Sequence, residues 1–91
     1  MLQYNIAYYL PTPPEEMVVA KVLDFPGALS QGFDLRDARF MIASALEDMA
    51  QTYLEEGLAL PMPDPSLEDP EADLIEKVSL SVIVPGPVRR H

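Results

Sequence analysis

Apolar and polar residues alternate with a period of two over residues 3–10, which is the pattern of a strand with one buried side. The prolines within residues 11–14 end this strand, because proline cannot continue a ladder of backbone hydrogen bonds. A second apolar run with several β-branched residues, 17–23, predicts a second strand that forms a hairpin with the first. A turn at residues 24–27 follows, and residues 28–32 leave room for a short third strand.

An apolar stripe at helical spacing predicts one long helix. Its members recur every three or four residues and are Leu35, Ala38, Ile42, Ala45, Leu46, Met49 and Tyr53. Asp34 stands at the N-cap position, and the acidic Asp37 three residues later suits the positive end of the helix dipole. Gly57 is placed to end the helix, because glycine adopts a positive φ without steric cost.

Residues 61–73 hold four of the ten prolines and five of the fifteen acidic residues, so we interpret them as an extended surface connection. Residues 77–84 alternate again and predict a last strand, which the prolines and glycine of residues 85–87 end. The pattern thus predicts one domain over residues 1–85, connection included, and a short tail over residues 86–91.

The element order β-β-β-α-β predicts an α+β fold. We expect a small, mainly antiparallel sheet with strand order 3-2-1-4, covered on one face by the single long helix. Right-handed connection rules favour a last strand parallel to the first. That strand is an apolar edge, and such edges are seldom left unpaired. We therefore expect a homo-oligomer in which the last strand, including Leu80 and Val82, pairs with another copy.

The chain has fifteen Asp and Glu residues against six Lys and Arg residues, a formal charge of −9. This charge disfavours binding to nucleic acid, which needs a basic surface to contact the phosphates, and favours a basic protein partner. Among the 91 residues, 48% are hydrophobic, which indicates one packed core. No apolar run approaches the roughly 20 residues of a membrane span, and no signal peptide is visible. The absence of cysteine fits a cytoplasmic protein.

Four features between Lys21 and Ser66 occur together in one order. They are a strand that runs into Asp24-Phe25-Pro26-Gly27, a Ser30-Gln31-Gly32 turn, a capped helix that begins near Asp37-Ala38, and an exit through Glu55-Glu56-Gly57 into a proline-rich segment. In this combination the chain resembles the HicB-like antitoxin domain. The residues that carry the structural motif are Asp24, Pro26, Gly27, Gly32, Asp34 and Gly57.

The resemblance implies a partial ribonuclease H-like fold in an intracellular prokaryotic protein that binds and blocks a small, basic HicA-type toxin. The histidine that cleaves messenger RNA then belongs to the toxin, and we expect no catalytic residue, metal or cofactor in this chain. Residues 11–16 depart from the family's short polar turn, and Phe40, Met41 and Ala43 lie where relatives tend to carry polar residues. Only seven residues follow Val84, too few for the operator-binding segment of full-length antitoxins, so we do not expect operator binding.

A ribonuclease H-like sheet also raises the alternative of a metal-dependent ribonuclease, which needs several carboxylates that converge on two cations. Asp24, Asp34 and Glu47 are the candidates, but a turn, a helix cap and solvation explain them without a metal. His91 is the only histidine and the last residue, so we expect it in a tail rather than as a catalytic base. The sequence contains no serine nucleophile elbow and no glycine-rich phosphate loop.

Phe33, Phe40 and Met41 are candidate interface residues near the start of the helix. Phe40 either packs at the rim of the helix, over the sheet or the proline-rich connection, or anchors a partner. Arg36 and Arg39 beside them are either solvated or form a polar rim. The function we expect is stoichiometric neutralisation of a toxin by protein–protein contact. An orphan oligomeric interaction module without a toxin is the other alternative.

Overall fold

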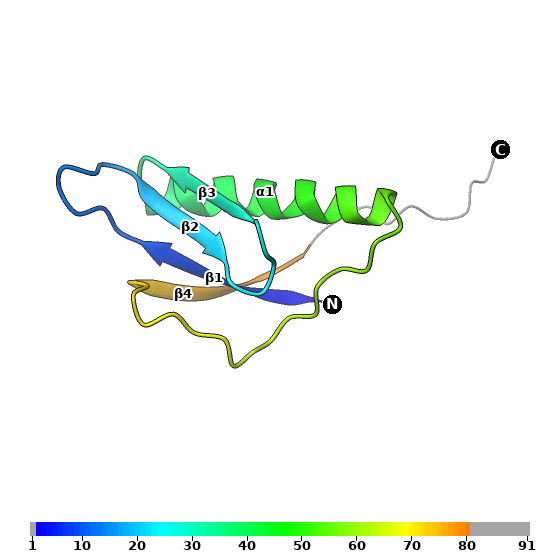
Figure 1. The fold of residues 1–91 in the computed structure, drawn as a ribbon. Helices are drawn as coiled ribbons and strands as arrows, with labels where there is room; N and C mark the ends of the chain where they lie inside the picture. Colours follow the sequence, from blue (N-terminus) through cyan, green and yellow to red (C-terminus); the bar gives the residue numbers. More distant parts are fainter. Residues whose placement is uncertain (1, 81–91) are drawn as a thin grey trace.

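A computed structural model describes residues 2–80 as four strands and one helix (Figure 1). In chain order these are β1 (Gln3–Tyr9), β2 (Val18–Val22), β3 (Leu29–Gly32), α1 (Leu35–Glu55) and β4 (Leu74–Ser79). The strands form one sheet in the order β3-β2-β1-β4, and α1 packs on one face of this sheet. The predicted α+β class, element order and strand order are therefore confirmed.

All three strand pairs are antiparallel, so the expectation of a last strand parallel to the first is wrong. The path of the connection between α1 and β4 explains the direction. Near the start of β1, the Tyr4 hydroxyl donates to the carbonyl of Pro61 at 2.6 Å. Near its end, the amide of Asp73 donates to the carbonyl of Tyr8 at 2.9 Å. The connection thus runs the length of the sheet, and β4 starts at the end where α1 begins.

The edge strand β4 begins three residues earlier than predicted, at Leu74 rather than at Lys77. Its pairing with the first strand continues to Leu80, whose amide donates to the carbonyl of Leu2 at 2.9 Å. Residues 81–84, the second half of the predicted strand, lie outside the described residues. Within residues 2–80, β4 pairs only with β1, so it is an edge of the sheet as predicted.

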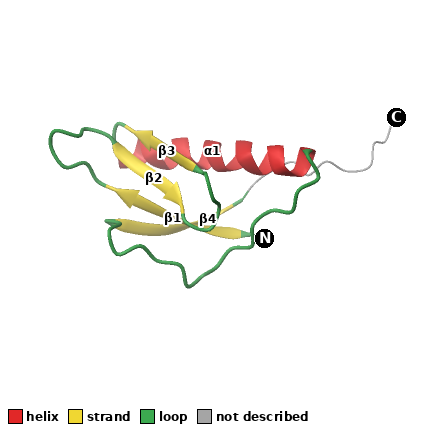
Figure 2. Cartoon of the chain, in the orientation of Figure 1, coloured by secondary structure: helices red, strands yellow, loops and turns green. Residues whose placement is uncertain are grey.

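β1 is buried on both sides, whereas its alternating pattern predicted one buried side. Tyr4, Ile6 and Tyr8 belong to the core beneath α1. Asn5 and Ala7, on the opposite side, are buried as well. The connection covers this second side, and Figure 2 shows it as the green loop that crosses the sheet away from the helix. The rest of the core comes from the other elements and comprises Val18, Ala20, Val22, Phe25, Ala28, Ala38, Ile42, Leu46, Ala50 and Leu80.

Both ends of α1 follow their sequence signals. The Asp34 carboxylate accepts a hydrogen bond from the amide of Asp37 at 2.8 Å, and the Asp37 carboxylate accepts one from the amide of Phe33 at 2.9 Å. This reciprocal cap confirms the predicted N-terminus. Gly57, with φ +74°, follows the last turn as predicted. The helix is not apolar enough over its length to cross a membrane.

Gly32 lies where β3 meets α1. A Cβ at this position would be 2.4 Å from the backbone nitrogen of Ala38. Any larger residue would therefore push the start of the helix away from the sheet. In the turn between β2 and β3, Gly27 has φ +89°, which a residue with a side chain rarely adopts.

Candidate functional site

The carboxylate of Asp24 joins three parts of the chain. It lies in the turn after β2, and only 6% of the residue is exposed. Its Oδ1 accepts a hydrogen bond from the amide of Asn5 at 3.0 Å, and its Oδ2 accepts one from Asn5 Nδ2 at 2.9 Å. The amide of Asp64 in the connection also donates to Oδ2, at 3.1 Å. Three N–H donors thus satisfy a buried charge that would otherwise be costly.

Asn5 completes this network on the second side of β1. Its Nδ2 also donates to the carbonyl of Asp64 at 2.7 Å, and its Oδ1 accepts from Lys77 Nζ at 3.0 Å. The side chain is therefore fully hydrogen-bonded, as a buried amide must be. The sequence pattern placed Asn5 on the exposed face of the first strand and missed this role. The only signal was a short polar residue in a run of large apolar ones.

The three carboxylates considered for a metal have separate surroundings. Both oxygens of Asp24 face N–H donors, Asp34 caps α1, and Glu47 is exposed on the helix. Within residues 2–80, no group of three or more His, Cys, Asp or Glu side chains is close enough together to hold a metal ion. The described carboxylates therefore give no support to the ribonuclease alternative.

Tyr9 fastens the connection to the far end of β1. Its hydroxyl donates to the Asp69 carboxylate at 2.6 Å. Burial, and then this hydrogen bond, raises the pKa of Tyr9 to about 12. The same bond lowers the pKa of Asp69. The amide of Leu10 donates to the Asp73 carboxylate at 2.7 Å. The acidic residues of the connection thus hold it against the sheet.

Arg39 forms an ion pair with Glu76. Of the two alternatives that the sequence left open for Arg39, the one in which it is only solvated is therefore wrong. Its Nε donates to Glu76 Oε1 at 3.0 Å, and its Nη2 lies 2.5 Å from Glu76 Oε2. The guanidinium also lies 6.0 Å from the centre of the Tyr8 ring. Burial, and then the charge of Glu76, raises the pKa of Tyr8 to about 12, and the bond from Arg39 lowers the pKa of Glu76. This contact connects α1 to β4.

The candidate interface residues at the start of the helix are exposed. The exposed fractions are 81% for Phe33, 69% for Phe40 and 40% for Met41. Packing of Phe40 over the sheet or the connection is therefore not observed. Leu80 is only 8% exposed and belongs to the core, so it is not an accessible contact residue. Val82 lies outside the described residues.

Charge is distributed unevenly along α1. At its start, the N-cap residue Asp34 and Asp37 balance Arg36 and Arg39. Residues 45–56 contain no Lys or Arg, and their four acidic residues are Glu47, Asp48, Glu55 and Glu56. The carbonyl groups at a helix C-terminus already form the negative end of the helix dipole, so acidic residues there are unfavourable. The last turn contains no basic residue that would offset them.

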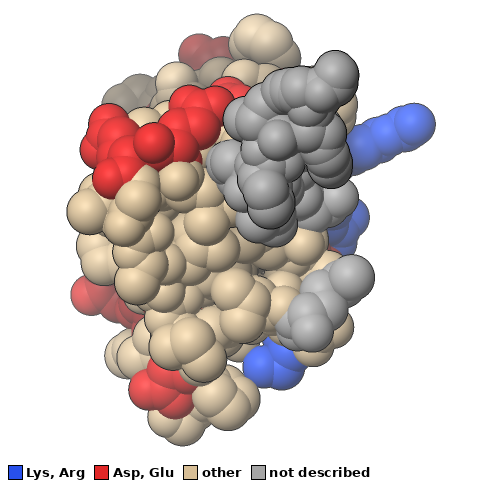
Figure 3. All heavy atoms as spheres, turned by 90° about the vertical axis from the view of Figure 1, so that its right-hand side faces the viewer, with Lys and Arg blue, Asp and Glu red and all other residues tan. Residues whose placement is uncertain are grey.

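Apolar side chains lie beside this acidic end of the helix. Leu58 and Met62 are exposed, Met62 by 75%. A shallow groove of about 190 Å³ is lined by Asp48, Met49, Thr52 and Tyr53. Figure 3 views this end of the molecule and shows uncharged atoms at its centre and acidic side chains along its upper margin. We call this region the acidic end surface, defined by Asp48, Glu55, Glu56, Leu58 and Met62.

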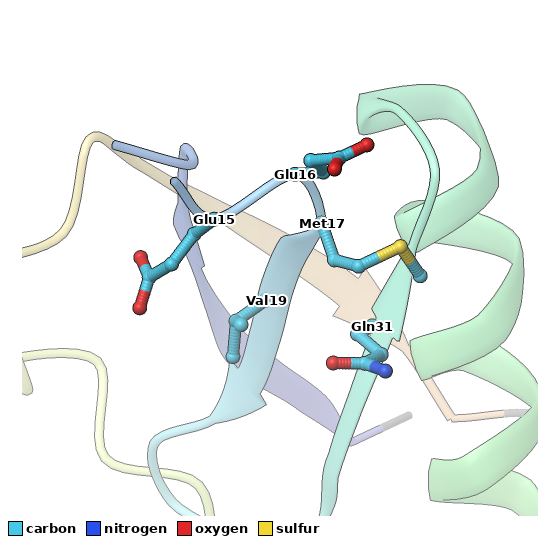
Figure 4. Close-up of a pocket in the computed structure, with 5 residues that line it drawn as sticks. All are labelled: Glu15, Glu16, Met17, Val19 and Gln31. Carbon is cyan, nitrogen blue, oxygen red and sulfur yellow. The ribbon is translucent and has the colours of Figure 1, made fainter. Parts of the chain in front are cut away.

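A second hollow, of about 240 Å³, lies where the β1–β2 hairpin enters the sheet. It is lined by Glu15, Glu16, Met17, Val19 and Gln31 (Figure 4). The two glutamate carboxylates point away from one another in Figure 4. They therefore do not converge on a common cation.

Comparison with known proteins adds no assignment. No family model matches the chain, and a search of curated proteins finds no relative.

Proposed function

We propose that this protein is an antitoxin-type inhibitor of the HicB-like class, which neutralises a small, basic, RNA-cleaving toxin by protein–protein contact. The observation that carries the proposal is the acidic end surface, where the exposed apolar Leu58 and Met62 follow the acidic Glu55 and Glu56 along the chain. An apolar centre with a charged margin is the usual composition of a protein–protein interface. The resemblance of residues 21–66 to HicB-like domains supplies the class of partner.

Electrostatics supports a basic partner at this surface. The net charge of −9 attracts a basic protein over a distance and speeds encounter. The acidic side chains Glu55 and Glu56 lie at the negative end of the helix dipole, where a cation from the partner would relieve their repulsion. An acidic surface of this kind also competes with RNA for the basic face of a ribonuclease.

The adjacent reading frame provides the test. We expect it to encode a short basic protein with one histidine, whose growth arrest is relieved by co-expression of this chain. Binding is then measured by surface plasmon resonance with purified proteins. The double variant Glu55→Gln/Glu56→Gln should lower the association rate about tenfold at low salt. The control Glu15→Gln/Glu16→Gln changes the net charge equally, at the hairpin, and should have a much smaller effect.

Equal effects of the two double variants would contradict the assignment of the acidic end surface. Absence of a basic neighbour, or of any complex with it, would contradict the antitoxin proposal and favour the orphan interaction module. Cleavage of RNA by the purified chain with Mn²⁺ or Mg²⁺ would favour the ribonuclease alternative instead.

A further inference from the structure

The outer side of α1 carries exposed apolar side chains in its first half, Phe40 and Met41, which no residue within 2–80 covers. The helix buries Ala38, Ile42, Leu46 and Ala50 against the sheet. At 3.6 residues per turn, positions 40, 44, 47 and 51 lie on the opposite side, and positions 36 and 43 lie at its margin. Phe40, on this side, is 69% exposed, and Phe33 just before the helix is 81% exposed. Exposed phenylalanines mark an interaction surface more often than a solvated face.

The charges on this face suit a second copy of the chain. Arg36 and Glu47 are both exposed, and neither forms an ion pair with another described residue. They lie eleven positions apart on either side of Phe40. In two antiparallel helices related by a two-fold axis near residue 42, Arg36 of each copy lies opposite the partner's Glu47, which gives two equivalent ion pairs.

The sizes of the side chains are complementary in the same arrangement. Phe40 of each copy then faces Ser44 of the other, with Ala43 at the margin of the contact, so a large ring meets small residues. Phe33 faces Gln51 near the end of the contact. Residues 34–44 have no net charge, whereas residues 45–56 carry four acidic residues and no basic ones. In a protein with a charge of −9, the first of these segments is where two copies approach with least repulsion.

We propose that the outer face of α1 is a homodimer interface, in which two helices pack antiparallel through Phe40 and pair Arg36 with the partner's Glu47. The two phenylalanines of each copy supply roughly 600 Å² of aromatic surface to the dimer, given about 200 Å² per ring. This area is below that of a standard stable interface, so the dissociation constant is expected in the micromolar range, on the order of 1–100 μM.

Sedimentation velocity of the full chain over about 5–500 μM, a range that brackets this affinity, tests the proposal. Phe40→Ser should raise the dissociation constant of the dimer at least tenfold, because the variant lacks the phenyl ring whose burial in the interface stabilises the dimer. Met62→Ser is the matched control, since it removes an equally exposed apolar side chain from the acidic end surface, and it should leave the dimer intact.

A charge exchange makes the test specific for the antiparallel arrangement. Arg36→Glu and Glu47→Arg should each weaken the dimer, and the double variant Arg36→Glu/Glu47→Arg should restore it. Circular dichroism confirms that each variant is folded. A chain that is monomeric at every concentration overturns the proposal.

If copies pair through the edge of β4 instead, as the sequence predicted, the variants give a different result. The amide of Leu80 donates to the carbonyl of Leu2. In an antiparallel pair, successive residues point their backbone amides to opposite sides, so the amide of Ser79 points to the free edge of the sheet. Ser79→Pro removes that donor without breaking a backbone hydrogen bond within the sheet, whereas Leu80→Pro would break one. Ser79→Ala is the control for the bond that the Ser79 hydroxyl accepts from Gln3 Nε2 at 3.3 Å. A dimer that survives Phe40→Ser and is lost in Ser79→Pro would overturn the helix interface. None of these measurements needs a toxin, so their outcome is independent of the proposed function.

Discussion

Replacing Asp24 by asparagine should destabilise the protein by about 2–4 kcal/mol, even though the two side chains have nearly the same shape. Asparagine keeps one oxygen, which can accept from the amide of Asn5, but it replaces Oδ2 by an NH₂ group. That NH₂ would face two donors, Asn5 Nδ2 and the amide of Asp64. A buried donor left without an acceptor costs about 1–3 kcal/mol. Asn5 is only 3% exposed, so water compensates little for its loss, whereas the amide of Asp64 is part-buried and its loss lies at the lower end of this range.

A domain of this size has a total stability of about 5–14 kcal/mol, so the variant should remain folded with a reduced margin. Urea unfolding followed by circular dichroism should show a midpoint about 2 M lower. Limited proteolysis should also show faster cleavage between Leu58 and Asp73, because the hydrogen bonds of Asp24 and Asn5 to the backbone of Asp64 hold this connection on the sheet. Asp48→Asn, an exposed change with the same loss of charge, should alter neither result. A loss below about 1 kcal/mol with unchanged proteolysis would refute the role assigned to Asp24.

Two further predictions concern the packing of β3 and the connection. Gly32→Ala should lower the free energy of unfolding by more than about 3 kcal/mol, because the new Cβ would lie 2.4 Å from the helix backbone. Gly57→Ala should lower it by only about 1–2 kcal/mol, because its positive φ is strained for alanine. Unfolding free energies that rank the two variants in the opposite order would contradict the close contact of β3 and α1. The pKa values of Asp64, Asp69 and Glu76 are lowered by hydrogen bonds in the folded protein, so their contribution is present above the unfolded values and is lost as pH falls. The urea concentration at the unfolding midpoint should therefore decrease when the pH is lowered below about 4. The decrease should be smaller in Tyr9→Phe, which lacks the bond to Asp69.

The elements that sequence alone predicted depend on local signals. α1 is specified by its apolar stripe, by the cap from Asp34 and by Gly57 after the last turn, all within one stretch of chain. The order of the first three strands in the sheet follows from the short connections between them, which leave few alternatives. These features need no knowledge of what lies on the other side of the sheet.

The features that sequence did not predict depend on the path of residues 58–73. Strand direction rules assume a short return after the helix, whereas this connection crosses the whole sheet before β4 begins. The same crossing buries the second side of β1 and turns Asn5 from an exposed residue into the centre of a polar network. The pair of Arg39 with Glu76 joins residues 37 positions apart. No local pattern encodes contacts that exist only after the connection has been placed.

The two proposed interactions use different parts of α1, the dimer its outer face around Phe40 and the basic partner its C-terminal end. They should respond to salt in opposite directions. Dimerisation brings together two chains of charge −9, and added salt screens the repulsion between them. The ion pairs of Arg36 would lie within the interface, where salt screens them less. Binding of a basic partner at the acidic end surface relies on long-range attraction, which salt weakens. Raising NaCl from about 50 to 500 mM, which shortens the screening length roughly threefold, should therefore strengthen the dimer and slow association with the partner. If salt weakened both, the outer face around Phe40 would not be the surface on which two copies meet.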